Sequence, residues 1–170
     1  AYLDRSFTWQ ESLERISKIA HSIKKLDISE GDRVAILAHN SDRYFEFLYS
    51  VSWAGAVFVP INTRLAPPEI EFWINDSESK LLFVDKNFAE IVINLKKDNK
   101  ISSVKNIVYL SDDTCPDNMV NYDDLITSET TEDALRGYDD LAGLFYTGGT
   151  TGRSKGVMLS HTNMVVDALN

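Results

Sequence analysis

The chain has 170 residues, of which 44% are apolar and 25% are charged, and its formal net charge is −9. This length and apolar content suffice for one globular domain with a real core, and they exclude a disordered chain. The acidic balance argues against nucleic-acid binding, and no apolar run approaches the ~20 residues that span a bilayer.

The first sixty residues predict two helix–strand units. Thr8 and Glu11 have the spacing of a capping box, which opens a helix, and Gly31 marks the turn into a buried strand over residues 34–38. Ser41 caps a second helix that stops at Gly55, and residues 57–61 form a second strand. One apolar stripe is expected in the first helix, formed by Leu13, Ile16, Ala20 and Ile23, and one face of the second helix holds Phe45, Leu48 and Ser52.

The alternation of helix and strand continues along the chain. Pro67 suits the first turn of a third helix, which is followed by a strand at residues 81–85, a helix at 88–95 and a strand at 107–110. Residues 141–146 and 157–159 are two more strands, and an apolar helical stripe then runs to Asn170 without a stop signal. We therefore predict an α/β fold whose mostly parallel sheet has helices on both faces, and we expect the chain to be part of a longer protein.

The excess negative charge lies in one segment, residues 111–140, which holds ten acidic residues and one base, Arg136. The segment has two interpretations, a metal site or a solvated connector. Its acidic residues lack the spacing of a calcium-binding loop, which favours the connector. The single cysteine, Cys115, cannot form an internal disulfide, and we expect no signal peptide. Both features predict a reducing, cytoplasmic compartment.

The most informative segment is residues 147–156, which read Thr-Gly-Gly-Thr-Thr-Gly-Arg-Ser-Lys-Gly. Glycines allow several N–H groups to turn toward one point, hydroxyls add donors or metal ligands, and Lys155 adds a positive charge. This composition predicts a polyphosphate site. It does not match the P-loop of nucleotide triphosphatases, because Ser154 precedes Lys155 and Gly156 follows it. The glycine spacing does not match the dinucleotide pattern either.

Residues 146–161 resemble the phosphate-loop motif of the adenylate-forming superfamily, which includes acyl-CoA synthetases, luciferases and the adenylation domains of peptide synthetases. Upstream, residues 31–37, 53–62 and 81–85 resemble, in the same order, the opening of an acyl-CoA synthetase. One position departs from the motif, because Ser154 stands where the family usually has proline. We therefore expect residues 148–154 to be more mobile than the usual loop.

The resemblance implies that residues 1–170 are the N-terminal portion of an AMP-binding domain and that residues 147–156, the phosphate loop, contact ATP. Lys155 would have a catalytic role at the departing pyrophosphate, and Thr147 would help to hold Mg²⁺ together with a carboxylate that this chain lacks. The acyl pocket, the adenine site and the mobile C-terminal domain would lie beyond Asn170. The residues implied around the phosphates are Thr147, Gly148, Gly149, Thr150, Thr151, Gly152 and Lys155.

The activity implied is that of an acyl-CoA synthetase of the fatty-acid type, which joins a carboxylate to ATP and then transfers the acyl group to coenzyme A. The partners would be these small molecules, and the fragment alone would be inactive. Two alternatives stay open: another adenylating enzyme, such as an amino-acid-activating domain, and a self-contained phosphate- or nucleotide-binding module.

Several residues outside the implied ligand set also carry expectations. Arg153, at the variable position of the motif, is expected to face solvent. His161 has two interpretations, one at the mouth of the site and one in the first turn of the last helix. Helical spacing favours a core or interface role over base stacking for Trp53, Phe72 and Trp73.

Overall fold

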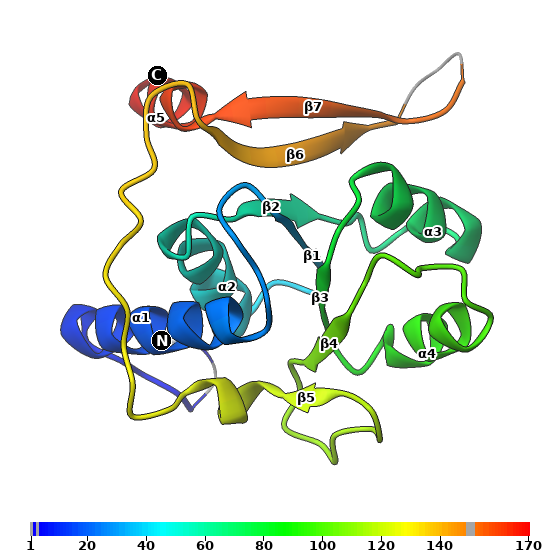
Figure 1. The fold of residues 1–170 in the computed structure, drawn as a ribbon, viewed down its shortest axis with the longest axis horizontal. Helices are drawn as coiled ribbons and strands as arrows, with labels where there is room; N and C mark the ends of the chain where they lie inside the picture. The colour runs from blue at the N-terminus through cyan, green and yellow to red at the C-terminus, as the bar shows by residue number, and fades with distance from the viewer. Residues whose placement is uncertain (1, 3, 149–151) are drawn as a thin grey trace.

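The computed structural model describes residue 2 and residues 4–148 and 152–170. Within these residues, seven strands form one sheet in the order β5-β4-β3-β1-β2-β6-β7 (Figure 1). The strands are β1 (Arg33–Leu37), β2 (Val57–Pro60), β3 (Leu81–Val84), β4 (Asn106–Tyr109), β5 (Val120–Asn121), β6 (Leu141–Thr147) and β7 (Lys155–Ser160). The helices are α1 (Trp9–Lys25), α2 (Asp42–Trp53), α3 (Pro67–Asp76), α4 (Ala89–Lys97) and α5 (His161–Leu169), with a 3-10 helix, η1, at Tyr122–Leu125.

The described pairings among β1 to β6 are parallel, and β7 runs antiparallel to β6. β1 lies between β2 and β3, where Val34 is in register with Phe58 on one side and with Leu81 on the other. The chain therefore leaves β1 toward one side of the sheet and returns across it to reach β3. The predicted α/β fold with a mostly parallel sheet is confirmed.

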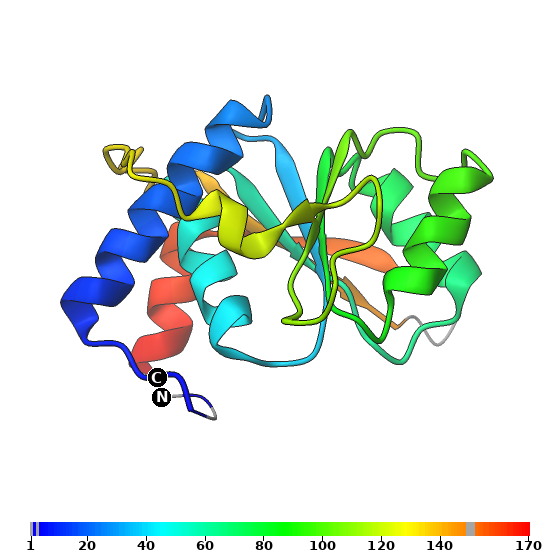
Figure 2. The ribbon, with the colours of Figure 1, turned by 90° about the horizontal axis from the view of Figure 1, so that it is seen from below.

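Helices cover both faces of the sheet, as Figures 1 and 2 show. One core joins α1, α2 and η1 to the sheet and includes Phe47 and Phe83. The other joins α3 and α4 to the opposite face and includes Trp73 and Leu82. Adjacent strand residues such as Leu82 and Phe83 enter different cores because side chains alternate along a strand. This explains why the inner strands are apolar throughout.

The predicted helix boundaries hold better than the predicted buried faces. Thr8 caps α1 through a capping box, and Gly55, at φ +83°, follows the end of α2. However, Leu13 is 50% exposed. In α2, Phe45 is exposed and Leu48 and Ser52 are only half-buried, so the face that these residues share is not the one that the helix buries. The residues that α2 buries are Arg43, Glu46, Phe47, Ser50 and Val51.

The face of α2 is set by charged side chains that are buried with partners. Glu46 accepts hydrogen bonds from Arg15 in α1 and from the hydroxyl of Tyr122 in η1. Arg43 donates to the carbonyl of Leu110 and to the carboxylates of Asp112 and Asp123. A buried ion is tolerated when it is paired and hydrogen-bonded, so these residues turn inward although they are charged.

Residues 111–140 are more than the solvated connector that the sequence favoured. They contain β5 and η1, and Tyr122 and Leu125 are buried in the first core. Further along, the carbonyl of Thr131 accepts hydrogen bonds from Ser17 and from the indole of Trp53. The segment therefore closes one side of the first core before it reaches β6.

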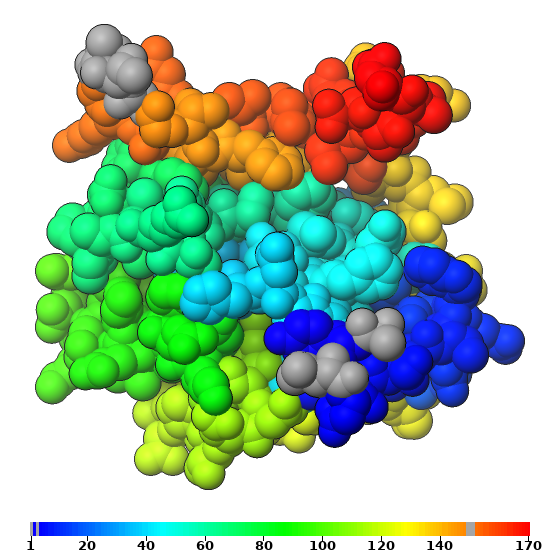
Figure 3. Space-filling view, turned by 180° about the vertical axis from the view of Figure 1, so that it is seen from behind, coloured from blue at the N-terminus to red at the C-terminus, as the bar shows by residue number. Residues whose placement is uncertain are grey.

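β6 and β7 form a hairpin at one side of the sheet, and α5 follows it (Figure 1). In Figure 3 the orange and red atoms of this part of the chain lie along the top of the molecule. β7 and α5 both present apolar side chains to solvent, including Met158 at 67% and Leu169 at 81% exposure. Within the described residues, no helix has the length and apolarity required to cross a membrane.

Candidate functional site

The two ends of the phosphate loop face each other across the β6–β7 pair. Thr147, the last residue of β6, is in register with Lys155, the first residue of β7. Opposed residues of an antiparallel pair project from the same face, with their Cβ atoms about 4.5–5.5 Å apart. The hydroxyl of Thr147 and the ammonium of Lys155 thus share one face at the base of the loop, and both residues are exposed.

Three of the implied ligands, Gly149, Thr150 and Thr151, lie outside the described residues. Gly148 and Gly152, on either side of them, are exposed. The expectation of a mobile loop over residues 148–154 includes these three positions and remains a prediction. Charge at the described part of the loop is positive, because Arg153 and Lys155 are its ionisable residues.

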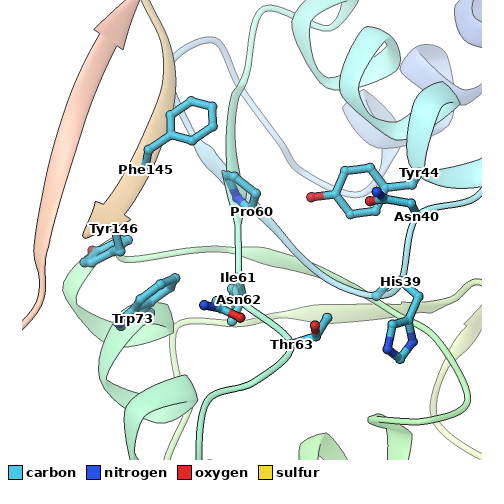
Figure 4. Close-up of a pocket in the computed structure, with 11 residues that line it drawn as sticks. His39, Asn40, Tyr44, Pro60, Ile61, Asn62, Thr63, Trp73, Phe145 and Tyr146 are labelled. Carbon is cyan, nitrogen blue, oxygen red and sulfur yellow. The ribbon is translucent and has the colours of Figure 1, made fainter. Parts of the chain in front are cut away.

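The loop lies at the edge of the sheet where the parallel strands end. Ligands of open α/β sheets bind outside these carboxyl ends. A cavity of about 530 Å³ lies at this edge (Figure 4). It is bounded by Tyr146 from β6 and by residues that follow β1 and β2, such as Asn40 and Asn62. The phosphate loop therefore begins directly beside a cavity whose walls come from three neighbouring strands.

Helix α3 contacts the residue that precedes the loop and one residue within it. The rings of Tyr146 and Trp73 stack at 4.7 Å between centroids with an interplanar angle of 20°, and the hydroxyl of Tyr146 donates to Asp76 at 2.7 Å. In the second half of the loop, the guanidinium carbon of Arg153 lies 5.4 Å from the centroid of the Phe72 ring. Arg153 is exposed as expected, but it also packs on an aromatic face. The expected packing role of Trp73 is confirmed, since it is buried in the second core.

His39, which from the sequence does not look like a ligand, is one of the residues that line the cavity. Its backbone N–H donates to Asp85 at 2.7 Å, and its Nδ1 lies 3.2 Å from the same carboxylate. The ring also lies against Phe88, with 5.2 Å between centroids. A signal for this residue existed in the sequence, because His39 directly follows one of two strands predicted to be parallel and Asp85 is the last residue of the other. Without the strand order, their proximity could not be inferred.

His161 is placed by the structure in the first turn of α5, which is one of its two interpretations. Its N–H donates to the carbonyl of Asp140 at 3.1 Å. It lies at the opposite end of β7 from Lys155, so the described structure does not bring these two residues together.

The acidic segment uses its carboxylates in ion pairs. Asp112 pairs with Arg5 and Arg43, and Asp123 pairs with Arg43. Burial acts to raise the pKa of Asp112, but the two arginines outweigh it and hold that pKa below its ordinary value. Among the residues that the structure describes, no group of three or more His, Cys, Asp or Glu side chains could hold a metal ion.

Cys115 has the environment of an unreactive thiol. Burial raises its pKa, and the negative charges of Asp124 and Asp117 raise it further. A raised pKa keeps the thiol protonated, whereas a nucleophilic cysteine needs the thiolate.

Comparison with known proteins supports a relationship along the whole chain. The model of the AMP-binding enzyme family matches residues 1–170. The chain is 33% identical over 165 residues to a feruloyl-CoA synthase from Amycolatopsis sp, covering 97% of this chain and 30% of that protein. It is 32% identical over 163 residues to a long-chain-fatty-acid–CoA ligase from Thermus thermophilus, covering 95% and 29% respectively. The chain thus spans about a third of the length of the curated relatives it matches.

Solved structures agree with the architecture. An anthranilate CoA ligase, AuaEII, in complex with anthranoyl-AMP superposes with a TM-score of 0.91 over 98% of this chain and 32% of its own, at 24% identity. The N-terminal domain of FACL13 from Mycobacterium tuberculosis superposes with a TM-score of 0.80 over 93% and 38%, at 32% identity. The first likeness shows the fold, and the family match covers every residue of this chain. The chain therefore belongs to the AMP-binding enzyme family.

Proposed function

We propose that this chain is the N-terminal part of an acyl-CoA synthetase and that its phosphate loop binds the polyphosphate of ATP. The observation that carries the proposal is the pairing of Thr147 with Lys155 at the base of the loop, at the carboxyl edge of the sheet. A hydroxyl donor and a cation on one face, followed by glycines, suit a phosphate chain. The family match supports the nucleotide as the source of that phosphate.

In the proposed reaction a carboxylate attacks the α-phosphate of ATP, so that acyl-AMP forms and pyrophosphate leaves. The thiol of coenzyme A then attacks the acyl carbon, loses its proton and forms the thioester, and AMP leaves. Lys155 would stabilise the charge that develops on the departing pyrophosphate, an interaction stronger in the transition state than in the ground state. Thr147 would supply one hydroxyl to Mg²⁺. When bound, Mg²⁺ supplies further neutralisation of phosphate charge.

We further propose a fatty acid as the acid substrate, as the sequence resemblance implies. The relatives include a long-chain-fatty-acid–CoA ligase and also a feruloyl-CoA synthase, so a panel of fatty and aromatic acids is the appropriate test. The acceptor proposed is coenzyme A. A relative named as a fatty acid–[acyl-carrier-protein] ligase, 32% identical over 167 residues, favours a carrier-protein thiol as the second candidate acceptor.

The decisive experiment compares the two half-reactions in the longer enzyme that contains this chain. Lys155→Ala should slow adenylate formation by a factor on the order of 10²–10³, the usual cost of one oxyanion-type contact. The thiol step, started from synthetic acyl-AMP, should be less affected because pyrophosphate has already gone. Single-turnover kinetics measure each step. Equal losses in both steps would mean that Lys155 supports the fold or domain closure and would contradict the phosphate role.

The 170-residue chain alone should bind ATP weakly and release no pyrophosphate, because the proposed adenine and acyl sites lie outside it. Carboxylate-dependent release of pyrophosphate by this chain would contradict the proposal that the adenine and acyl sites lie outside it. Tight binding that separates ATP from GTP would instead favour the self-contained nucleotide module.

A further inference from the structure

Tyr146 is held on both faces of its ring. One face stacks on Trp73. On the other side is Gly156, which is in register with Tyr146 across the hairpin. A methyl group built on Gly156 would lie 3.2 Å from Cζ and 3.5 Å from both Cε atoms of the ring. These distances place that methyl over the ring face, so the ring occupies the space that a side chain at position 156 would need.

The contacts of Tyr146 anchor the hairpin to a rigid element. Trp73 is 3% exposed and belongs to the second core, so it provides a fixed surface for the stack. Asp76, one turn further along α3, accepts the hydrogen bond from the Tyr146 hydroxyl. Burial, followed by this bond to a carboxylate, raises the pKa of Tyr146 well above its ordinary value. The hydroxyl therefore keeps its proton and remains the donor across the working pH range.

The anchor is adjacent to the proposed phosphate ligands on both strands. Tyr146 precedes Thr147 in β6, and Gly156 follows Lys155 in β7. Because side chains alternate along strands, the Tyr146 ring lies on the α3 side while Thr147 and Lys155 project from the opposite face. Because Tyr146 and Gly156 are their neighbours in the chain, a displacement of the ring would change the positions of the Thr147 and Lys155 side chains. The contact of Arg153 with Phe72 ties the far arm of the loop to the same helix.

We infer that Tyr146 is a positioning residue, which, with Trp73, Asp76 and Gly156, fixes the direction in which Thr147 and Lys155 meet the phosphates. The inference rests on the proposed function, because it assigns a second layer of residues to the same loop. Tyr146 does not itself contact the ligand in this assignment. Its effect should appear in phosphate affinity more than in the stability of the domain, since the buried strands of the sheet, β1 and β3, lie elsewhere.

The test is a titration of the isotope-labelled 170-residue chain with inorganic pyrophosphate, followed by NMR. Tyr146→Leu should weaken binding about three- to tenfold, the range expected from loss of one aromatic pair. Tyr146→Phe keeps the stacked ring and should recover most of that loss. Asp76→Asn keeps an acceptor for the hydroxyl and should stay within about twofold of the original chain, as expected for a neutral hydrogen bond replacing a charged one.

The control is Phe58→Leu. Phe58 in β2 belongs to the first core and packs edge-on against Phe145, which precedes Tyr146 in β6, at 5.7 Å between ring centroids. Urea unfolding should show that Phe58→Leu is at least as destabilising as Tyr146→Leu, while its pyrophosphate affinity is unchanged. Equal affinity losses in both variants would mean general loosening of the hairpin and would overturn the positioning role. Should Tyr146→Leu not fold, Gly156→Ala displaces the same ring and must weaken binding.

The result also separates the two proposals. If the unmodified chain does not bind pyrophosphate, the proposed phosphate role itself fails. If it binds and Lys155→Ala weakens binding, but Tyr146→Leu and Gly156→Ala bind as tightly as the original chain, the positioning inference alone is wrong.

Discussion

Gly143 is a position in β6 where the packed core leaves no room for a methyl group. A Cβ there would lie 2.6 Å from Cε2 of Phe58 and 3.0 Å from Cε2 of Phe145. Since Phe58 is buried, its ring cannot move away freely. Gly143→Ala should therefore lower the free energy of unfolding by about 1–3 kcal/mol, the usual cost of overpacking.

The matched control for this substitution is Gly137→Ala, because a Cβ at Gly137 meets nothing within 4 Å. Its effect should stay within about 0.5 kcal/mol, as for other surface changes. Urea denaturation of the three proteins measures both differences. A Gly143→Ala protein as stable as the Gly137→Ala protein would show that the Phe58 ring shifts at no cost.

Asp32 gives the fold a predictable response to acid. Its carboxylate is 11% exposed, pairs with Lys80 at 2.7 Å and accepts the Ser29 N–H at 3.0 Å. Burial acts to raise its pKa, but these two contacts outweigh burial and lower the pKa in the folded state. A lowered pKa stabilises the fold at neutral pH, and this contribution is lost as the pH falls from about 3.9, the value for unfolded Asp, through the folded value.

The prediction for Asp32 is that Asp32→Asn lowers the free energy of unfolding at pH 7 and makes the protein less sensitive to acid. Unfolding measured between neutral pH and about pH 3 should therefore show converging curves for the variant and the original chain. Asp27→Asn, at an exposed position of the same turn region, serves as the control and should leave the acid response unchanged. Parallel curves for Asp32→Asn would exclude this residue as a source of the response.

At the scale of single elements, the start of α1 depends on one reciprocal pair of hydrogen bonds. Oγ1 of Thr8 accepts the Glu11 N–H at 3.2 Å, and the Glu11 carboxylate accepts the Thr8 N–H at 2.7 Å. Thr8→Ala should cost about 0.5–2 kcal/mol of stability. Thr8→Ser retains the hydroxyl and should recover most of it. If alanine and serine give the same unfolding midpoint, the cap contributes nothing.

Elements with strong local signals could be predicted from the sequence, and those fixed by distant partners could not. The Thr8 cap, the Pro67 start of α3 and the inward Trp73 all follow from neighbouring residues. The inner face of α2 does not, because Glu46 is buried only by virtue of Arg15, 31 residues before it, and Tyr122, 76 residues after it. Hydrophobic periodicity treats such a carboxylate as exposed.

The same limit applies to the candidate site. Local composition predicted a phosphate loop that includes Thr147 and Lys155, because glycine, hydroxyl and lysine occur there together, and this role stays a prediction. The stack of Tyr146 on Trp73 joins residues that are far apart in the sequence. It depends on β6 lying beside β2, and the strand order was not predicted. For the same reason the neighbouring cavity and the position of His39 in it could not be anticipated.

At the scale of the whole molecule, the sheet joins a rigid centre to an exposed margin. β1 and β3 are flanked by strands on both sides and are buried on both faces. Among the described residues, β6 pairs with β2 at one register position, Phe58 with Gly143, and β7 has a strand neighbour on one side. The phosphate loop is thus carried by an exposed hairpin that joins the rest of the sheet at one described register position, while α3 packs in the second core.

This arrangement predicts an order of opening that hydrogen exchange can measure. Local stability follows burial and contact density, so amides of β7 should exchange much faster than those of β1 and β3 under native conditions. Exchange in β7 should then report a local opening of the hairpin, with only a weak dependence on denaturant, whereas exchange in β1 should follow global unfolding. β4, which is paired on both sides at the other half of the sheet, is the control, and its exchange should resemble that of β1 more than that of β7.

Pyrophosphate should slow exchange in β7 selectively, because a ligand that binds only the closed hairpin stabilises it by mass action. If β7 is as well protected as β1, the hairpin unfolds only with the whole domain, and the loop has no independent motion for phosphate binding to restrain.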